Sequence, residues 1–172
     1  FQNIRLFPTM TVLENVLIGR HCRTRAGILG AVLQDPRTRA EEQAAVDRSY
    51  ELLHEVGLAQ HYNEEARNLP YGAQRRLEIA RALATDPAVL LLDEPAAGMN
   101  PQETLELKSL VLHLRERLEL SILLIEHDMG MVMSLSDRIY VMEYGSRIAM
   151  GTPREVRANP RVIKAYLGES DA

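Results

Sequence analysis

Two adjacent carboxylates follow the longest aliphatic run of the sequence. Residues 88–92 read Ala-Val-Leu-Leu-Leu, and Asp93, Glu94 and Pro95 come directly after them. Such a run favours a strand buried on both faces of a parallel sheet, and α/β sheets bind ligands at the carboxyl ends of their strands. Asp93 can offer a hard oxygen ligand to Mg²⁺ on nucleotide phosphates, and Glu94 would then point toward the terminal phosphate, where a base or a water-orienting group is useful. The same residues can also simply end a strand and open a turn.

A histidine follows a second apolar segment. Residues 122–125 read Ile-Leu-Leu-Ile and lead through Glu126 to His127. An imidazole at the end of a strand could hydrogen-bond a phosphate or a nearby water molecule. The alternative is an ordinary half-exposed loop histidine, which is how we interpret His21, His54, His61 and His113.

A glycine-containing turn precedes a helix in residues 69–76, which read Leu-Pro-Tyr-Gly-Ala-Gln-Arg-Arg. Free backbone N–H groups and the positive end of a helix can face an anion at such a place. By itself this signal is weak, because any turn before a helix has it.

Alternating strand and helix signals in the second half of the chain would position these groups. We expect strands over 88–92, 122–125, 138–142 and 146–149, and helices over 74–84 and 129–135, from Asn100, and from Thr152 and Asn159. On helix 74–84, the polar side is expected to consist of Arg75, Arg76, Glu78 and Arg81. The first half is expected to hold a capping box from Thr11 to Glu14 with a helix to Gly19, a partly ordered loop over 20–40 that could include one short helix, and a helix over 41–56 that stops at Gly57.

Composition excludes several classes of protein. The chain has 172 residues, 46% of them hydrophobic and 26% charged, which is ordinary for one globular domain and unlike disordered or repetitive proteins. A net charge of −4 gives no basic field for nucleic-acid binding. We find no apolar run long enough to span a bilayer and no signal peptide. Because the chain begins with Phe1, we expect it to begin inside a longer protein.

In their order and spacing, the three segments resemble the ATP-binding-cassette (ABC) ATPase family over essentially the whole chain. The resemblance implies an α/β fold of the P-loop NTPase, ABC type, with a partial RecA-like parallel sheet core and a helical subdomain. The implied parts are a glutamine loop over 1–7, a helical subdomain over 8–72 that ends at the signature motif, and the C-terminal part of the RecA-like ATPase core over 73–172.

The resemblance also implies roles for individual residues around ATP and Mg²⁺. Asp93 would be the Mg²⁺ carboxylate of the second Walker motif, and Glu94 the catalytic carboxylate. His127 would be the switch histidine near the γ-phosphate. Gln2 would contact Mg²⁺ or the attacking water and link the site to membrane subunits.

Two further segments would act across a dimer of ATPases. Asn100 would belong to the loop that crosses to the partner ATPase. The signature motif would cap the nucleotide held by the other subunit, and it consists of Leu69, Pro70, Tyr71, Gly72 and Ala73. Here Pro70 replaces a hydroxyl residue of the family and Ala73 replaces its Gln, so we expect weakened phosphate capping.

Segments 94–101, 125–129, 136–141, 151–153 and 165–169 are similar to the ATPases of branched-chain amino-acid importers, in particular the larger of the two. That resemblance implies two membrane permease subunits, a second ATPase subunit as heterodimer partner, an indirect link to a periplasmic or extracellular solute-binding protein, and no nucleic acid. It also implies a peripheral position on the cytoplasmic side of the cell (inner) membrane. Transporters of urea, short amides and lipopolysaccharide share many of these segments and remain alternatives.

The family's phosphate-binding loop, Gly-x-x-x-x-Gly-Lys-Ser/Thr, does not occur in the sequence. The only lysines are Lys108 and Lys164, and they follow Leu107 and Ile163. In the family this loop lies upstream of the glutamine loop, so we expect it before residue 1 and expect the 172 residues alone to be inactive. A truncated cassette that only binds membrane subunits is the alternative. A chromosome-maintenance ATPase is a third reading, but it would need long heptads between the motifs, which are absent.

Overall fold

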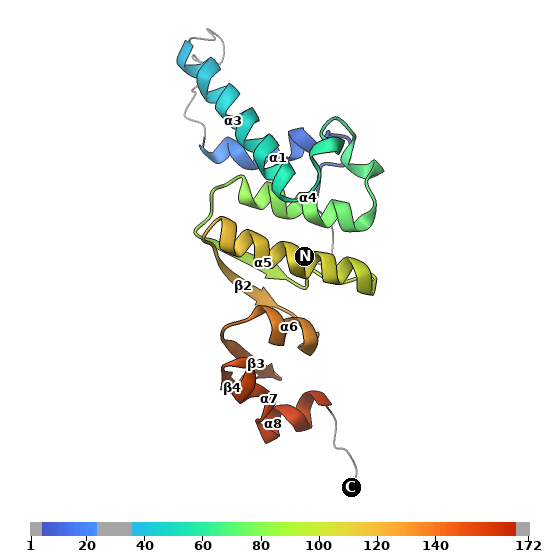
Figure 1. The fold of residues 1–172 in the computed structure, drawn as a ribbon, viewed down its shortest axis with the longest axis vertical. Helices are drawn as coiled ribbons and strands as arrows, with labels where there is room; N and C mark the ends of the chain where they lie inside the picture. Colours follow the sequence, from blue (N-terminus) through green and yellow to red (C-terminus); the bar gives the residue numbers. More distant parts are fainter. Residues whose placement is uncertain (1–4, 24–35, 168–172) are drawn as a thin grey trace. The chain divides into compact units, whose positions relative to one another are not determined.

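The structure, a computed structural model, describes residues 5–23 and 36–167, and it forms two compact units, Phe1–Leu123 and Leu124–Ala172. In the first unit the elements are α1 (Val12–Arg20), η1 (His21–Arg23), α3 (Pro36–Glu55), η2 (Ala59–His61), η3 (Ala66–Asn68), α4 (Tyr71–Leu83), β1 (Val89–Asp93), α5 (Pro101–Arg117) and the start of β2 (Ser121–Ile125) (Figure 1). In the second they are α6 (Met129–Leu135), β3 (Ile139–Glu143), β4 (Ser146–Gly151), α7 (Pro153–Arg157), α8 (Pro160–Val162) and η4 (Ile163–Leu167).

Three helices, α1, α3 and α4, pack against one another in the first unit (Figure 1). The predicted capping box at the start of α1 is confirmed, because Thr11 N donates to Glu14 Oε2 at 2.7 Å and Glu14 N donates to Thr11 Oγ1 at 3.1 Å. Each helix contributes fully buried aliphatic side chains, among them Val12, Val16, Leu52, Leu53, Leu77 and Leu83. Burial of such side chains, at about 1.5–3 kcal/mol each, is what holds the helices together.

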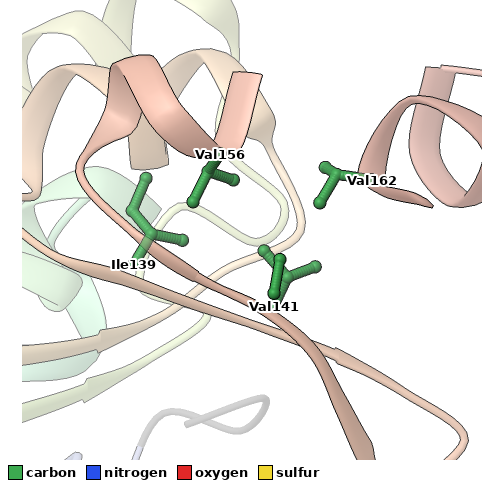
Figure 2. Packing of buried hydrophobic residues seen from close by; sticks show 5 residues of the cluster. Ile139, Val141, Val156 and Val162 are labelled. Carbon is green, nitrogen blue, oxygen red and sulfur yellow. The ribbon is translucent and has the colours of Figure 1, made fainter. Parts of the chain in front are cut away.

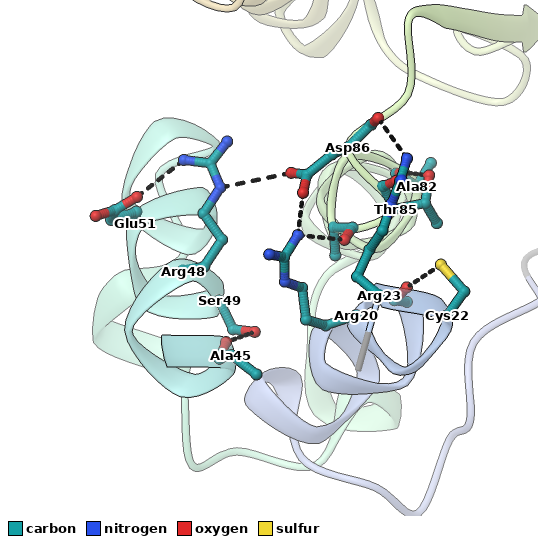
Figure 3. Close-up of polar contacts among 12 residues, drawn as sticks. Arg20, Cys22, Arg23, Ala45, Arg48, Ser49, Glu51, Ala82, Thr85 and Asp86 are labelled. Carbon is teal, nitrogen blue, oxygen red and sulfur yellow. Dashed lines mark hydrogen bonds and ion pairs between the residues drawn. The ribbon is translucent and has the colours of Figure 1, made fainter. Parts of the chain in front are cut away.

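Polar contacts join the C-terminal end of α1 and η1 to the residues that follow α4 (Figure 3). Arg23 Nε donates to the carbonyl of Thr85 at 2.7 Å, and its Nη2 donates to the carbonyl of Asp86 at 2.9 Å. Arg20 pairs with the Asp86 carboxylate. Arg23 therefore satisfies two carbonyl groups just beyond the C-terminal end of α4, and Arg20 pairs with the Asp86 side chain next to them.

Strands β1 and β2 are neighbours in a two-stranded sheet, and α5 connects them along the chain. The backbone N–H of Ser121 donates to the carbonyl of Ala88 at 3.3 Å, which joins the beginnings of the two strands, so the strands are parallel. Leu90 and Leu92 are buried, but Leu91 is 61% exposed and Val89 51%. The expectation that this strand is buried on both faces is wrong for the described residues, because only one face of the sheet is covered.

The second unit is built on a β-hairpin of β3 and β4 (Figure 2). Its two turn residues, Tyr144 and Gly145, both have left-handed φ angles, 45° and 75°, as a tight two-residue hairpin requires. The predicted helix start at Thr152 is confirmed by a second capping box with Glu155. A small core of five side chains joins the hairpin to α7 and α8, namely Ile139, Val141, Ala149, Val156 and Val162.

The ends of most predicted helices and strands lie within a few residues of the observed ends. The largest difference is α3, which begins at Pro36 instead of residue 41, so residues 36–40 of the predicted loop belong to this helix and not to a separate short one. Proline is favoured in the first turn of a helix, and the residues that follow it do not break one. Residues 20–23 of that predicted loop form the end of α1 and η1, and residues 24–35 lie outside the described residues. The predicted boundary at residues 72 and 73 falls within α4 and stays a prediction.

Candidate nucleotide-binding and catalytic site

Asp93 and Glu94 lie where β1 ends, as predicted. Asp93 is the last residue of the strand and is exposed, while Glu94 is half-buried. Glu94 has a left-handed φ of 45°, which is unusual for a residue other than glycine and costs about 1–2 kcal/mol. The backbone N–H of Ala97 donates to the Glu94 carbonyl at 3.1 Å, so the chain turns sharply after the carboxylates. A strained acidic residue at the carboxyl end of a parallel strand is typical of a functional site.

The signature segment forms the start of α4. Pro70 is the N-cap residue and offers no side-chain hydrogen bond to the helix. The N–H groups of Tyr71, Gly72 and Ala73 lie in the first turn, where a helix leaves backbone donors without internal partners. Leu69 and the Ala73 side chain are buried. What this segment can offer an anion is therefore its backbone and the helix end, and not its side chains.

The structure brings the signature segment and the turn after Glu94 together. The Tyr71 hydroxyl donates to the carbonyl of Ala97 at 2.8 Å. Asn100 lies further along the same turn and is the N-cap of α5, where its Oδ1 accepts from Glu103 N at 2.9 Å. The structure thus explains Asn100 as a helix cap, and its contact with a partner ATPase stays a prediction.

Two other predicted site residues lie outside the described part of the first unit. Gln2 lies outside the described residues. His127 is exposed in the second unit, between β2 and α6, where its backbone N–H donates to Glu126 Oε2 at 3.3 Å. The next residue, Asp128, caps α6 by accepting from Met131 N at 3.0 Å. The roles of Gln2 and His127 therefore stay predictions.

Sequence reasoning missed a buried ion pair. Arg75 and Glu78 were expected on the polar side of their helix, yet they are only 3% and 8% exposed. That expectation is wrong, because Arg75 Nη1 donates to Glu78 Oε2 at 3.0 Å and each charge is compensated within the fold. Opposite charges three residues apart on a helix were the signal that could have indicated the pair. On the same helix, burial lowers the pKa of Arg81, whose guanidinium lies 5.8 Å from the Phe7 ring centre.

The donors at the site fit a nucleotide-bound Mg²⁺. Over residues 5–23 and 36–167, no three or more His, Cys, Asp or Glu side chains are grouped so that they could hold a metal ion. A Mg²⁺ ion on nucleotide phosphates needs only one or two carboxylates, since phosphates and water supply its other ligands. Asp93, exposed at the sheet edge, fits that requirement. None of the helices in the described ranges is long and apolar enough to cross a membrane.

A parallel β-α-β unit with carboxylates at the strand end and a helix start beside them is typical of ligand-binding α/β proteins, nucleotide-binding ones among them. The ABC transporter family matches residues 1–97, and the branched-chain amino acid ATP-binding cassette transporter family matches residues 146–172. The chain therefore belongs to the ABC transporter ATP-binding family. Membership in this family implies nucleotide binding.

Curated relatives agree with this assignment. The chain is 52% identical over 170 residues to the high-affinity branched-chain amino acid transport ATP-binding protein LivG of Salmonella typhimurium, covering 99% of this chain and 67% of that protein. It is 49% identical to BraF of Pseudomonas aeruginosa, with the same coverage. It is 33% identical to the lipopolysaccharide export system ATP-binding protein LptB of Escherichia coli, covering 98% and 64%. The chain thus spans about two thirds of the length of these relatives.

Solved structures agree as well. The ADP conformation of an ATP-binding cassette of an ABC transporter superposes with a TM-score of 0.75 at 33% identity, covering 94% of this chain and 64% of that one. A nucleotide-free ATP-binding cassette gives a TM-score of 0.73 at 31% identity, covering 98% and 67%. The predicted fold class, a P-loop NTPase of ABC type, is confirmed.

Proposed function

We propose that the full-length protein is the ATP-hydrolysing subunit of an importer for branched-chain amino acids. By the full-length protein we mean these 172 residues together with any others that the gene encodes. The observation that carries this proposal is the 52% identity with LivG over 170 residues, combined with Asp93 and Glu94 at the end of a parallel strand. LptB, which serves lipopolysaccharide export, is less similar at 33%.

Glu94 is the proposed general base. Its carboxylate would accept a proton from the water that attacks the terminal phosphate, a step that typically contributes about 10²–10⁴ in rate. Asp93 would hold Mg²⁺, which, when bound, neutralises charge on the phosphates. We assign orienting roles near the phosphate to Gln2 and His127.

The signature segment is proposed to act on the nucleotide of a partner ATPase. The N–H groups of Gly72 and Ala73 and the N-terminal end of α4 would face the γ-phosphate there. Pro70 has no backbone N–H and no hydroxyl, so it can donate nothing to that phosphate. We therefore propose a weakened cap and unequal ATP sites in a heterodimer.

The proposed assembly has two permease subunits, this ATPase and a second ATPase subunit. A solute-binding protein outside the membrane would act through the permeases, and the ATPase would lie peripherally on the cytoplasmic side. A truncated, non-catalytic cassette remains the second candidate, because the 172 residues contain no Gly-x-x-x-x-Gly-Lys-Ser/Thr segment. The DNA upstream of Phe1 distinguishes the two candidates.

Transport assays in proteoliposomes test the proposal. The full-length protein is reconstituted with its membrane subunits and solute-binding protein, and ATP hydrolysis is measured with leucine, urea, a short amide or no solute. We expect leucine to stimulate hydrolysis and to accumulate inside the vesicles. If only urea or the amide stimulated hydrolysis, the transported solute would be that compound and not a branched-chain amino acid. An assembly that hydrolyses no ATP would favour the non-catalytic candidate.

A further inference from the structure

A buried ion pair in α4 contacts the segment at the start of the described chain. Glu78 Oε2 accepts from Arg75 Nη1 at 3.0 Å, and Glu78 Oε1 accepts from the backbone N–H of Arg5 at 2.7 Å. Burying two charges is costly unless both are fully compensated by neighbours. Glu78 is compensated from two directions, and it ties α4 to Arg5, which lies within the segment predicted to be the glutamine loop.

The other end of the pair reaches the signature segment. Arg75 Nη2 donates to the Tyr71 hydroxyl at 2.9 Å, and its guanidinium carbon lies 5.3 Å from the Tyr71 ring centre. Arg75 Nε is buried with no hydrogen-bond partner among the described residues. Arg75 therefore relies on Glu78 and Tyr71 for the side-chain contacts that hold it in place.

Tyr71 connects Arg75 to the turn after Glu94. Its hydroxyl donates to the Ala97 carbonyl at 2.8 Å while it accepts from Arg75. Gly98 has a φ of 77°, and a Cβ atom built there would lie 3.4 Å from the Tyr71 hydroxyl. The ring is thus packed directly on the turn as well as hydrogen-bonded to it.

A second close approach holds the same two segments. A Cβ atom built on Gly72 would lie 3.0 Å from Glu103 Oε1, and Glu103 Oε2 accepts from Asn100 N at 2.9 Å. The start of α4 therefore lies close to the start of α5 as well as to the turn. A displacement of one should displace the other, since close-packed groups have little room to slide.

We propose that Tyr71 is a positioning residue: through its hydroxyl and the buried pair of Arg75 and Glu78, it fixes the turn 94–100 relative to the signature helix and to the segment at Arg5. Tyr71 acts through the turn and not on the phosphate itself. The effect on ATP turnover rests on the proposed function, whereas the effect on the turn does not.

The first test measures the turn directly by residue-resolved amide hydrogen exchange on the full-length protein. Tyr71→Phe removes only the hydroxyl, which makes two hydrogen bonds, and the control Tyr50→Phe removes a hydroxyl with no hydrogen bond to the described residues. Within the turn, Ala97 N donates to the Glu94 carbonyl and Met99 N to the Ala96 carbonyl, each at 3.1 Å. We expect these two amides to exchange about tenfold faster in Tyr71→Phe. We expect no change in α1 or in Tyr50→Phe. Exchange at Ala97 and Met99 within twofold of the parent would overturn the proposal.

The second test measures turnover of the same variants in the assembled transporter. We expect Tyr71→Phe to lower kcat by roughly fivefold while KM for ATP stays within twofold, because the turn and not the nucleotide contact is disturbed. An unchanged kcat with faster exchange would overturn the link between the turn and turnover. A parent that hydrolyses no ATP would defeat the proposed function alone, and the exchange result would still decide the role of Tyr71.

Discussion

Arg48 in α3 and Asp86 beyond the end of α4 form an ion pair, with 3.8 Å between Nε and Oδ1 (Figure 3). Arg20, at the end of α1, pairs with the same carboxylate. One aspartate thus bridges two helices that are separated from it by many residues. Its φ of 46° is left-handed, a conformation that Asp and Asn tolerate better than other residues with a side chain.

Asp86→Asn should destabilise the protein by about 1–2 kcal/mol, because it removes the charge of two half-exposed pairs while it keeps the backbone conformation. Urea unfolding followed by circular dichroism measures the loss, and 1 M NaCl should shrink it. The control Glu51→Gln affects only an exposed pair with Arg48, at 2.8 Å, and should cost less than about 0.5 kcal/mol. Equal losses in the two variants would show that Asp86 is an ordinary surface charge.

Glu14 should make stability depend on acid pH. Its hydrogen bonds from the backbone and the side chain of Thr11 lower the pKa of this carboxyl below its usual 4.5. A carboxyl whose pKa is lowered on folding stabilises the protein above its unfolded pKa, and that contribution is lost as the pH falls through the folded pKa. Urea midpoints between pH 6 and pH 3 should therefore fall less steeply in Glu14→Gln than in the parent. The control Glu116→Gln changes an exposed carboxylate and should keep the parental slope.

Much of the fold could be predicted because its signals are local. The capping residues Thr11, Asn100 and Thr152 each have a glutamate three residues later, and each caps a helix in the structure. Asp93 and Glu94 could be placed at the end of a strand because an aliphatic run precedes them and a proline follows them. These patterns depend on a few neighbouring residues and on no tertiary contact.

The rest depended on contacts that the sequence does not encode locally. Arg75 and Glu78 look like surface charges until Arg5 and Tyr71 are placed beside them. The exposure of Leu91 follows from what covers the sheet, and an aliphatic run does not specify that. The role of Tyr71 likewise became visible only when Ala97, 26 residues away, was found at its hydroxyl.

The 172 residues alone should not bind Mg·ATP tightly. They lack a phosphate-binding loop with its lysine, and their only lysines are Lys108 in α5 and Lys164 in η4. Isothermal titration calorimetry with the 172-residue chain measures this, with the full-length protein for comparison. Low-micromolar binding by the short chain, about −8 kcal/mol, would show that its own residues suffice for tight binding.

The central claim, that Glu94 is the catalytic carboxylate of an ABC ATPase, is tested most directly by Glu94→Gln in the full-length protein assembled with its membrane subunits. The substitution keeps the size and hydrogen bonding of the side chain but removes its basicity. We expect ATP turnover to fall by about 10²–10⁴ while ATP still binds, and closed, ATP-loaded dimers to accumulate. Glu143→Gln, which changes an exposed carboxylate at the end of β3, serves as the control and should leave turnover within about twofold of the parent. Turnover of Glu94→Gln within about twofold of the parent would contradict the account, because Glu94 would then be only a turn residue.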